Sequence, residues 1–476
     1  MSTGTVTPPP TRSDMPLSGS APPSPAGPAP ADGAPVVLPP TVNLPRALQT
    51  LRLTVRQIQF MFRARRELGE VFGINGIIDR GVIVVTGHPD HVKSLFTASP
   101  DEAPSLTGDS PLRPIVGPNS VLTAVGPRHM RQRKLLLPPF HGEAVQRYTE
   151  MIAEVADREI ERWPIGRPLA LAPRMQAITL DVIMAGVFGI EGRPAKGTPE
   201  HGLRRAVRWV LELSTRPEAQ VAELLNLGRP EPVGPTRAVL AYLDRHVYAV
   251  IGARRSAQDA ARRTDILSVL LDAETEDGER LTDKELRDEL LTLVLAGHET
   301  TANSLAWIIE RLLRNPASYD RLRETARSEK DPDGYLEATI HEGMRSRPVI
   351  PVIGRNVTVP WQLGEYSVPE GSSVLISILL LHHRHDVYPD PFAFRPERFI
   401  GRKPGTYTWI PFGGGVRRCL GASLAMAEQR VVLGAIARRT DLYAPDRRPE
   451  RARHRNVTMI PAEGARVVVA ARRSPA

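Results

Sequence analysis

The chain has 476 residues, of which 41% are hydrophobic and 24% charged, and its formal net charge is +9. This composition is typical of a folded globular protein and excludes a wholly disordered chain. The single cysteine, Cys419, excludes an internal disulfide and any zinc site that needs two or more cysteines. Arginine supplies 56 of the 62 basic residues, and no basic run is interleaved with aromatic residues, so the charge does not predict nucleic-acid binding.

The first 40 residues differ in composition from the rest, with twelve prolines and only three charged residues. Such a segment buries too little apolar surface to order itself, so we expect a disordered tail over 1–40 and a folded domain over 41–476. The tail has neither the basic start nor the apolar stretch of a secretory signal. No apolar run is long enough to cross a bilayer, which predicts a cytoplasmic protein without a transmembrane segment. For Leu48–Phe62, a buried amphipathic helix is favoured over peripheral membrane contact, which stays open.

The elements predicted after the tail are mostly helices. Residues 81–87 read as a strand, Pro89 begins a short helix, and Pro127 can open a helix that ends before Pro138. Further helical spacing runs through 141–190 and 236–275. Residues 374–381 predict a buried strand or helix, which periodicity alone does not distinguish. The segments 457–460 and 465–471 predict a hairpin.

One helix is predicted to be unusually long. Thr282 and Glu285 form a capping box, and the next stop signal is Asn315-Pro316. The interval allows about thirty helical residues, or ~45 Å at 1.5 Å per residue. A helix of this length can cross the whole domain.

The middle of this helix reads Ala296-Gly297-His298-Glu299-Thr300. Glycine there costs roughly 1 kcal/mol relative to alanine, so it needs a packing or functional reason. Ala296, Gly297 and Thr300 share a face that a flat ligand could approach closely, and Glu299 with Thr300 could relay protons to it. Taken alone, the segment favours the simpler alternative, a helix–helix contact over Gly297 with Thr300 bonded back to its own helix.

The segment around the cysteine is the most informative part of the sequence. It reads Pro411-Phe-Gly-Gly-Gly-Val-Arg-Arg-Cys-Leu-Gly421. The glycines permit a tight, non-helical loop, and the cysteine stands before a helix predicted from about Leu420 to Ala437. Amide groups at a helix N-terminus stabilise a thiolate, and one thiolate can be the axial ligand of a haem iron. A buried inert cysteine is the alternative, but it leaves the glycines and Arg417 unexplained.

The pattern Phe412-x-x-Gly415-x-Arg417-x-Cys419-x-Gly421 resembles the haem-binding signature of the cytochrome P-450 superfamily of haem-thiolate monooxygenases. Three further motifs resemble this family and follow in the family's order. They are the oxygen-activation segment Ala296–Thr300, the pair Glu342-x-x-Arg345, and the segment Phe394–Phe399 with Arg398. The resemblance covers about residues 41–476 and looks like the bacterial branch of the family, in particular its actinobacterial members.

The resemblance implies one α+β domain, mainly α with small β-sheets, in a triangular fold whose long distal helix lies over haem b (iron protoporphyrin IX). It implies that Cys419 binds the iron and that Phe412 shields the sulfur from water. Glu299 and Thr300 would deliver protons during dioxygen activation, beside Ala296 and Gly297. Glu342, Arg345 and Arg398 would form a buried ion network that stabilises the fold.

The haem propionates need cationic partners, and the resemblance assigns them to His129, Arg133, Arg355 and Arg417. His129 and Arg133 stand four residues apart on one helix and therefore point the same way. Other basic residues could form a docking patch for an acidic electron donor. These are Arg128, Arg131, Lys134 and Arg418. His382, His383 and His385 are interpreted as loop residues rather than a metal cluster.

Too few residues follow Cys419 to form a flavin reductase domain, so electrons are expected from NAD(P)H through a ferredoxin and its reductase. The expected substrate is hydrophobic and resembles a lipid, terpenoid, steroid or polyketide. Its pocket would be bordered by Leu293, Ala296, 349–353 and 459–460, with specificity set by the loops 99–125 and 195–235. The alternatives are a peroxide-driven peroxygenase, an isomerase and a non-catalytic haem protein. The intact Glu299-Thr300 pair favours the dioxygen pathway.

Overall fold

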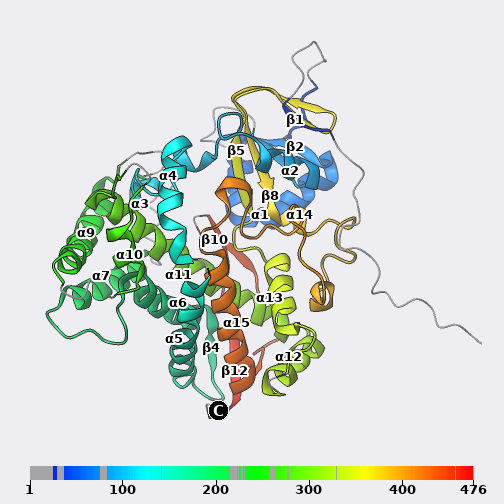
Figure 1. The fold of residues 1–476 in the computed structure, drawn as a ribbon. Coiled ribbons are helices and arrows are strands. Elements are labelled where there is room, and N and C mark those ends of the chain that lie inside the picture. The colour runs from blue at the N-terminus through cyan, green and yellow to red at the C-terminus, as the bar shows by residue number, and fades with distance from the viewer. Residues whose placement is uncertain are drawn as a thin grey trace, which may run out of the picture.

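The computed structural model of the chain describes residues 25–28, 37–75, 83–110, 112–140, 142–214, 222, 225–226, 229, 231–257, 263–275, 278–328, 330–455 and 457–474. Helices dominate these residues, and the strands form small sheets. Figure 1 shows the sheet of β2, β3, β8 and β5 gathered with α1, α2 and α14 at one side of the molecule. Helices α5, α6, α7, α9 and α10 form the other side, with α4, α11 and α15 between the two parts.

The helices of the first half are α1 (Arg46–Leu68), α2 (Pro89–Thr97), α3 (Arg113–Val116), α4 (Gly126–Leu136), α5 (Glu143–Ile160), α6 (Leu171–Phe188), α7 (Pro199–Ser214) and α9 (Gly234–Arg255). The second half contains α10 (Ile266–Asp272), α11 (Asp283–Leu313), α12 (Pro316–Ser328), α13 (Tyr335–Ser346), α14 (Ile378–His382) and α15 (Ala422–Arg439). Short 3₁₀ turns are η2 (Leu106–Asp109), η3 (Pro138–Phe140), η5 (Pro396–Phe399) and η6 (Gly415–Arg417).

The largest sheet among the described residues has the order β2-β3-β8-β5 and comprises β2 (Val71–Ile74), β3 (Ile83–Thr86), β8 (Ser373–Ser377) and β5 (Val352–Asn356). Only the β3–β8 pair in it is parallel. A second sheet joins β1 (Ala26–Pro28), β6 (Trp361–Leu363) and β7 (Tyr366–Val368). A third joins β4 (Pro168–Ala170), β12 (Arg466–Arg472) and β9 (Thr440–Tyr443), and a fourth pairs β10 (Ala452–Arg455) with β11 (Thr458–Pro461).

The long helix predicted from the capping box is confirmed as α11, which has 31 residues. Thr282 accepts a hydrogen bond from the Glu285 backbone N–H, and the Glu285 side chain accepts one from the Thr282 backbone. Most of α11 is buried, and its apolar residues join the largest hydrophobic cluster with those of α5, α6 and α15. The helix therefore forms the centre of the domain.

Two sequence expectations differ from the structure, and a third, which was left open, is settled by it. Strands β11 and β12 are not a hairpin, because β11 pairs with β10 whereas β12 pairs with β4 and β9. Most of the predicted tail lies outside the described residues, but Ala26–Pro28 form a strand on β6, and so are ordered. The segment 374–381 contains both predicted alternatives in succession, the end of β8 and the start of α14.

Helix α6 is the one described helix that is long and apolar enough to cross a membrane, although no such segment was expected from the sequence. However, 67% of its residues are buried inside the molecule. Its Thr179 donates a hydrogen bond of 2.7 Å to the carbonyl of His298 on α11. In this structure α6 is therefore a core helix.

Candidate active site

The loop that carries the cysteine packs against the end of α2. Gly413 and Gly415 have φ of +66° and +62°, in the left-handed region that favours glycine. A Cβ at Gly414 or Gly415 would collide with Phe96 of α2. The glycines are thus needed both for the turn and for the close approach of the loop to α2.

Cys419 stands three residues before the start of α15, and its N–H donates a 2.9 Å hydrogen bond to the carbonyl of Phe412. Its side chain is exposed, yet desolvation by the surrounding protein atoms raises the pKa of the thiol above its usual 9.0. The N–H of Gly421, Arg133 and Arg418 act in the opposite direction. A coordinating metal ion deprotonates a thiol outright, so a bound iron would favour the thiolate, as these three groups do. A Cβ at Gly421 would meet no atom within 4 Å, so the loop adjoins open space.

The oxygen-activation segment lies in the middle of α11. Ala296 is exposed although most of the helix is buried, which indicates a space beside this stretch. The Thr300 hydroxyl donates a 2.6 Å hydrogen bond to the carbonyl of Ala296. A Cβ on Gly297 would collide with Ile183 of α6. The glycine therefore has a helix–helix packing reason, as the simpler alternative proposed, and it does not itself require a ligand.

The carboxylate of Glu299 is held by the β10–β11 hairpin. Arg455 of β10 forms an ion pair with it at 2.8 Å, and the Thr458 hydroxyl donates to the same oxygen at 3.2 Å. Asn303, one turn further along α11, bonds to the Glu299 carbonyl at 2.9 Å. Arg455 was not predicted as a site residue, because it stands 156 residues from its partner and belongs to no motif.

The four residues expected to bind propionates form a set of cationic or potentially cationic groups. Within the described part of the chain, none of them forms an ion pair with a carboxylate. His129 and Arg355 are only 4% and 5% exposed. Arg417 donates hydrogen bonds to the carbonyls of Ala124 (2.7 Å) and Val121 (3.4 Å).

Mutual repulsion and burial destabilise the charges of this set. Burial lowers the pKa of Arg355 to about 10, and burial together with Arg355 and Arg133 lowers that of Arg417 to about 10. Burial and the three arginines lower the pKa of His129 to about 4. Buried cations need anionic partners, and a group with two carboxylates supplies them. Together with the accessible cysteine, this donor set fits haem.

The predicted ion network is confirmed on α13. Arg345 binds the two carboxylate oxygens of Glu342 at 2.7 and 2.8 Å, and Arg398 lies 3.5 Å from one of them. The side chains of Glu342 and Arg345 are completely buried. The Glu342 carboxylate also accepts the backbone N–H of Arg395 at 2.8 Å, so the network joins α13 to the turn before η5.

His382 was interpreted as a loop residue, but it is the last residue of α14 and is fully buried. Its carbonyl accepts a 2.7 Å hydrogen bond from Arg345, and its Nε2 accepts one of 3.0 Å from the N–H of Ile410. Burial and Arg345 lower the pKa of the imidazole, which keeps Nε2 available as an acceptor. The histidine therefore connects the ion network to the segment that leads into the cysteine loop.

The residues of the predicted basic docking patch differ in their surroundings. Arg131 forms ion pairs of 3.0 Å with Glu279 and Glu285 at the start of α11, and Arg128 also lies near Glu285. Arg418 instead lines a cavity beside the cysteine loop. Arg131 is thus paired with acids of the chain, whereas Arg418 forms no ion pair among the described residues.

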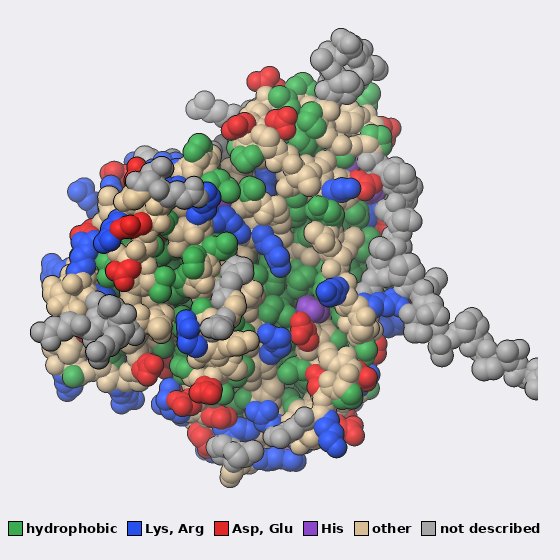
Figure 2. Space-filling model, in the orientation of Figure 1, with side chains coloured by type: hydrophobic (Ala, Val, Ile, Leu, Met, Phe, Trp, Pro, Cys, Tyr) green, Lys and Arg blue, Asp and Glu red, His purple; other side chains and the backbone are tan. Residues whose placement is uncertain are grey.

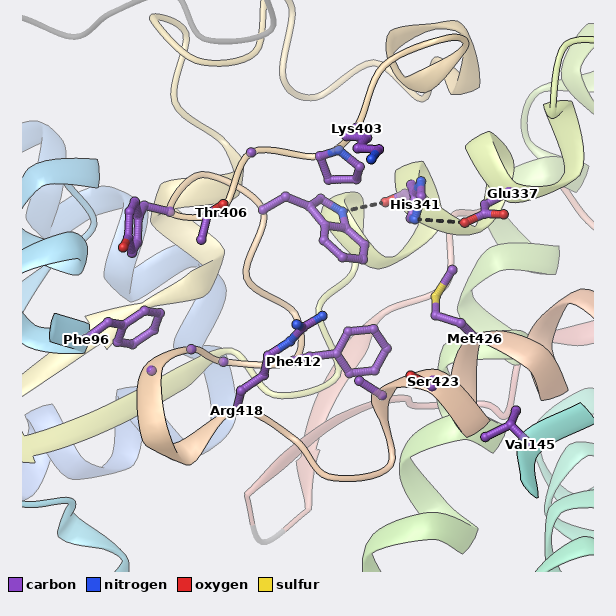
Figure 3. Close-up of a pocket in the computed structure, with 18 of the residues that line it drawn as sticks. Phe96, Val145, Glu337, His341, Lys403, Thr406, Phe412, Arg418, Ser423 and Met426 are labelled. Carbon is purple, nitrogen blue, oxygen red and sulfur yellow. Dashed lines mark hydrogen bonds and ion pairs between the residues drawn. The ribbon is translucent and has the colours of Figure 1, made fainter. Parts of the chain in front are cut away.

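This cavity, which we call the proximal cavity, has a volume of about 690 Å³. Figure 3 shows Arg418 beside Phe412 on one side of it and His341 with Glu337 on another. The face of the molecule drawn in Figure 2 has hydrophobic side chains near its middle, bordered by Lys and Arg side chains. The basic residues that line the proximal cavity are Lys403, Arg418 and Arg430.

The helical fold, the cysteine in its glycine loop and the acid–alcohol pair on the long helix agree with the class that the sequence resembles, the haem-thiolate monooxygenases. Comparison with known proteins agrees: the family model described as Cytochrome P450 matches residues 38–469, and the chain belongs to this family. It is 38% identical to cytochrome P450 138 of Mycobacterium tuberculosis, over 93% of this chain and 98% of that protein. It is 36% identical to cytochrome P450 135B1 of the same species, over 92% of each chain.

The fold is also similar to the solved structure of cyanobacterial CYP120A1 with bound retinoic acid. The TM-score is 0.74 at 22% sequence identity, and the match covers 91% of this chain and 99% of that one. Membership of the cytochrome P450 family makes the protein an oxidoreductase that uses haem b, with electrons from NAD(P)H that reach it through redox partners.

Proposed function

We propose that this monooxygenase inserts one oxygen atom from dioxygen into a hydrophobic small molecule of the lipid, terpenoid, steroid or polyketide kind. Apolar residues near the oxygen-activation segment support this substrate class: Met459 and Ile460 follow Thr458, whose hydroxyl donates to Glu299. Met459 donates its N–H to the Val349 carbonyl at 2.7 Å, and Trp307 of α11 donates to the Met459 carbonyl at 3.0 Å. These contacts bring together two of the segments expected at the substrate pocket. A cytoplasmic location is part of the same proposal.

The observation that carries the proposal is the combination of one accessible cysteine with four basic side chains that have no carboxylate partner within the described residues. Cys419 would bind the iron, and His129, Arg133, Arg355 and Arg417 would bind the propionates. When bound, the haem supplies the site at which dioxygen is reduced and activated. The carbon monoxide difference spectrum of the reduced holoprotein tests this directly: thiolate ligation gives a strongly red-shifted Soret band, and its absence from folded holoprotein contradicts the proposal.

The chain's own contribution on the distal side is proton transfer. The Thr300 hydroxyl is fixed by the Ala296 carbonyl and can pass a proton while keeping its position. Arg455 and Thr458 both bind one carboxylate oxygen of Glu299, which leaves the other oxygen to exchange protons. Glu299 would thus supply protons and Thr300 would deliver them.

Replacing Thr300 by alanine is expected to uncouple electron consumption from product formation. Without the hydroxyl, proton delivery loses its final group, and reducing equivalents leave as hydrogen peroxide. A positioned proton-transfer group contributes about 10²–10⁴-fold to rate, so the ratio of product to NAD(P)H consumed should fall at least severalfold. Thr300→Ser retains the hydroxyl and should stay close to wild type. An unchanged ratio in Thr300→Ala would show that Thr300 has no part in proton delivery.

We infer that the electron donor is an acidic iron–sulfur protein of the ferredoxin type that binds over the proximal cavity. The cavity adjoins Phe412 and the glycines of the cysteine loop, so a protein bound there lies near the iron ligand. Arg418 and Lys403 are exposed, and neither is paired with a carboxylate of the described residues. Two unpaired cations at the rim favour a negatively charged partner.

Charge reversal by Arg418→Glu is therefore expected to slow reduction by an acidic ferredoxin about tenfold or more at low salt, with the difference shrinking as salt is added. Stopped-flow reduction at several ionic strengths measures this. Arg208→Glu makes an equal charge change at an exposed residue of α7, a helix that packs on α9 and contributes no residue to the proximal cavity. This variant should therefore leave the rate unaltered. If both variants behave alike, Arg418 does not contact the donor.

A further inference from the structure

The short loop Asn119–Ala124 lies between α11 and Arg417 and is hydrogen-bonded to both. We call it the bridging segment. Glu289 of α11 accepts a 2.7 Å hydrogen bond from the N–H of Val121. On the other side, Arg417 donates to the carbonyls of Val121 and Ala124. A single stretch of backbone thus lies between an acid of the long helix and an arginine of the cationic set.

The rest of the bridging segment is attached to α11 in the same place. Asp288 accepts hydrogen bonds from the backbone N–H and the side-chain amide of Asn119, at 3.1 and 2.9 Å. The hydroxyls of Ser120 and Thr292 are 2.6 Å apart. Three consecutive residues of the segment are therefore bound by α11, which fixes the direction of the carbonyls that bind Arg417.

The environment of Glu289 suits a neutral carboxylic acid rather than a carboxylate. The residue has no exposed surface, and its Oε2 has no hydrogen-bond partner among the described residues. Burial is the main cause that raises the pKa of Glu289 well above its usual 4.5, and the charges of Asp288 and Glu285 add to it. The Val121 N–H and Arg128 of α4 act in the opposite direction.

We propose that Glu289 is a positioning residue for haem binding, which holds Val121 so that the bridging segment places Arg417 against a propionate. The inference rests on the role proposed above for Arg417. Ionisation of Glu289 would put a second negative charge beside Asp288 in a region that water does not reach, and the bridging segment would have to move to relieve it. Arg417 would then lose the two carbonyls that orient it.

The sign of the expected pH effect follows from the direction of the pKa shift. A group whose pKa is higher in the folded protein stabilises the folded state at low pH, and this contribution is lost as the pH rises through the folded pKa. Haem retention should therefore weaken in alkaline solution in the wild-type protein. Glu289→Gln keeps the neutral acceptor of the Val121 N–H and cannot ionise, so it should remove this alkaline weakening.

The test is the rate at which the holoprotein transfers haem to apomyoglobin between pH 6 and pH 8.5, which lies below the pKa of about 10 of Arg355 and Arg417, after thiolate ligation has been established in the wild type. We expect the wild-type rate to rise with pH and the Glu289→Gln rate to stay flat. Glu289→Ala leaves the Val121 N–H without its acceptor and should release haem about tenfold faster than the wild type at neutral pH. Glu279→Gln, an exposed acid near the start of α11, should follow the wild-type profile.

The proposal is overturned if the wild-type rate does not change with pH or if Glu289→Gln shows the same alkaline acceleration. It is equally overturned if Glu289→Ala folds and releases haem at the wild-type rate. Should Glu289→Ala fail to fold, the pH profile of Glu289→Gln decides the matter alone. A wild-type protein that never shows thiolate ligation would contradict the proposed haem site instead, so the two failures are distinguishable.

Discussion

Cys419→Ser is expected to abolish both the red-shifted Soret band of the reduced carbon monoxide complex and detectable product formation. A serine hydroxyl is a far weaker iron ligand than a thiolate, and the chain has no second thiol to take its place. The neighbouring groups are arranged for a sulfur anion: the N–H of Gly421 and the charges of Arg133 and Arg418 all favour the thiolate. None of these groups can give a hydroxyl the same charge at neutral pH.

Ser423→Ala provides the matched control for this experiment. Ser423 lies four residues after Cys419, on the first turn of α15, and lines the proximal cavity without being a candidate ligand. The variant should keep the wild-type spectrum and product yield. A Cys419→Ser protein that retains haem and oxidises substrate at the wild-type rate would disprove the assignment of the iron ligand.

The parts of the site that depend on neighbouring residues could be predicted from the sequence. The capping box of Thr282 and Glu285, the pair of Glu342 and Arg345, and the left-handed turns in the cysteine loop each form within a few residues. Local geometry fixes such contacts almost completely, because residues three or four apart on a helix necessarily lie on the same face. The order of these motifs then identified the fold.

The parts that depend on distant contacts could not be predicted. Arg455 meets Glu299 only because β10 and β11 pair beside α11, and nothing in the sequence near Arg455 indicates that partner. Likewise, the run of β-branched residues in β12 indicates a strand, but its hydrogen bonds go to β4 and β9, and β4 is nearly 300 residues earlier in the chain. Strand pairing is set by the packing of the whole domain, so such a run identifies a strand without identifying its neighbour.

Glu289 shows a third limit, in which the residue type is misleading. Its charge alone suggests a solvated acid, whereas the structure buries it completely. Only the loop that donates the Val121 N–H explains why a carboxyl group stands there. Buried acids of this kind are visible only once the loop that covers them has been placed.

Glu342→Ala is expected to lower the free energy of unfolding by about 3–5 kcal/mol and to leave protein that does not retain haem. The substitution removes the only carboxylate that pairs with Arg345 among the described residues, and this guanidinium has no exposure to water. It also removes the acceptor of the Arg395 N–H and the nearest carboxylate to Arg398. Urea unfolding of the haem-free protein and the absorbance of haem per molecule after purification measure the two effects.

Loss of haem should follow from loss of the ion pair because Arg345 also donates to the His382 carbonyl, and His382 in turn accepts the Ile410 N–H. An unpaired Arg345 would reorient toward water and release this connection to the cysteine loop. Glu337→Ala, on the same helix with a half-exposed side chain, should change unfolding by less than about 1 kcal/mol. If Glu342→Ala matched that control, the network would be a consequence of the fold rather than one of its causes. The cysteine loop would then be held in place by its packing on Phe96 and by the hydrogen bonds of Arg417.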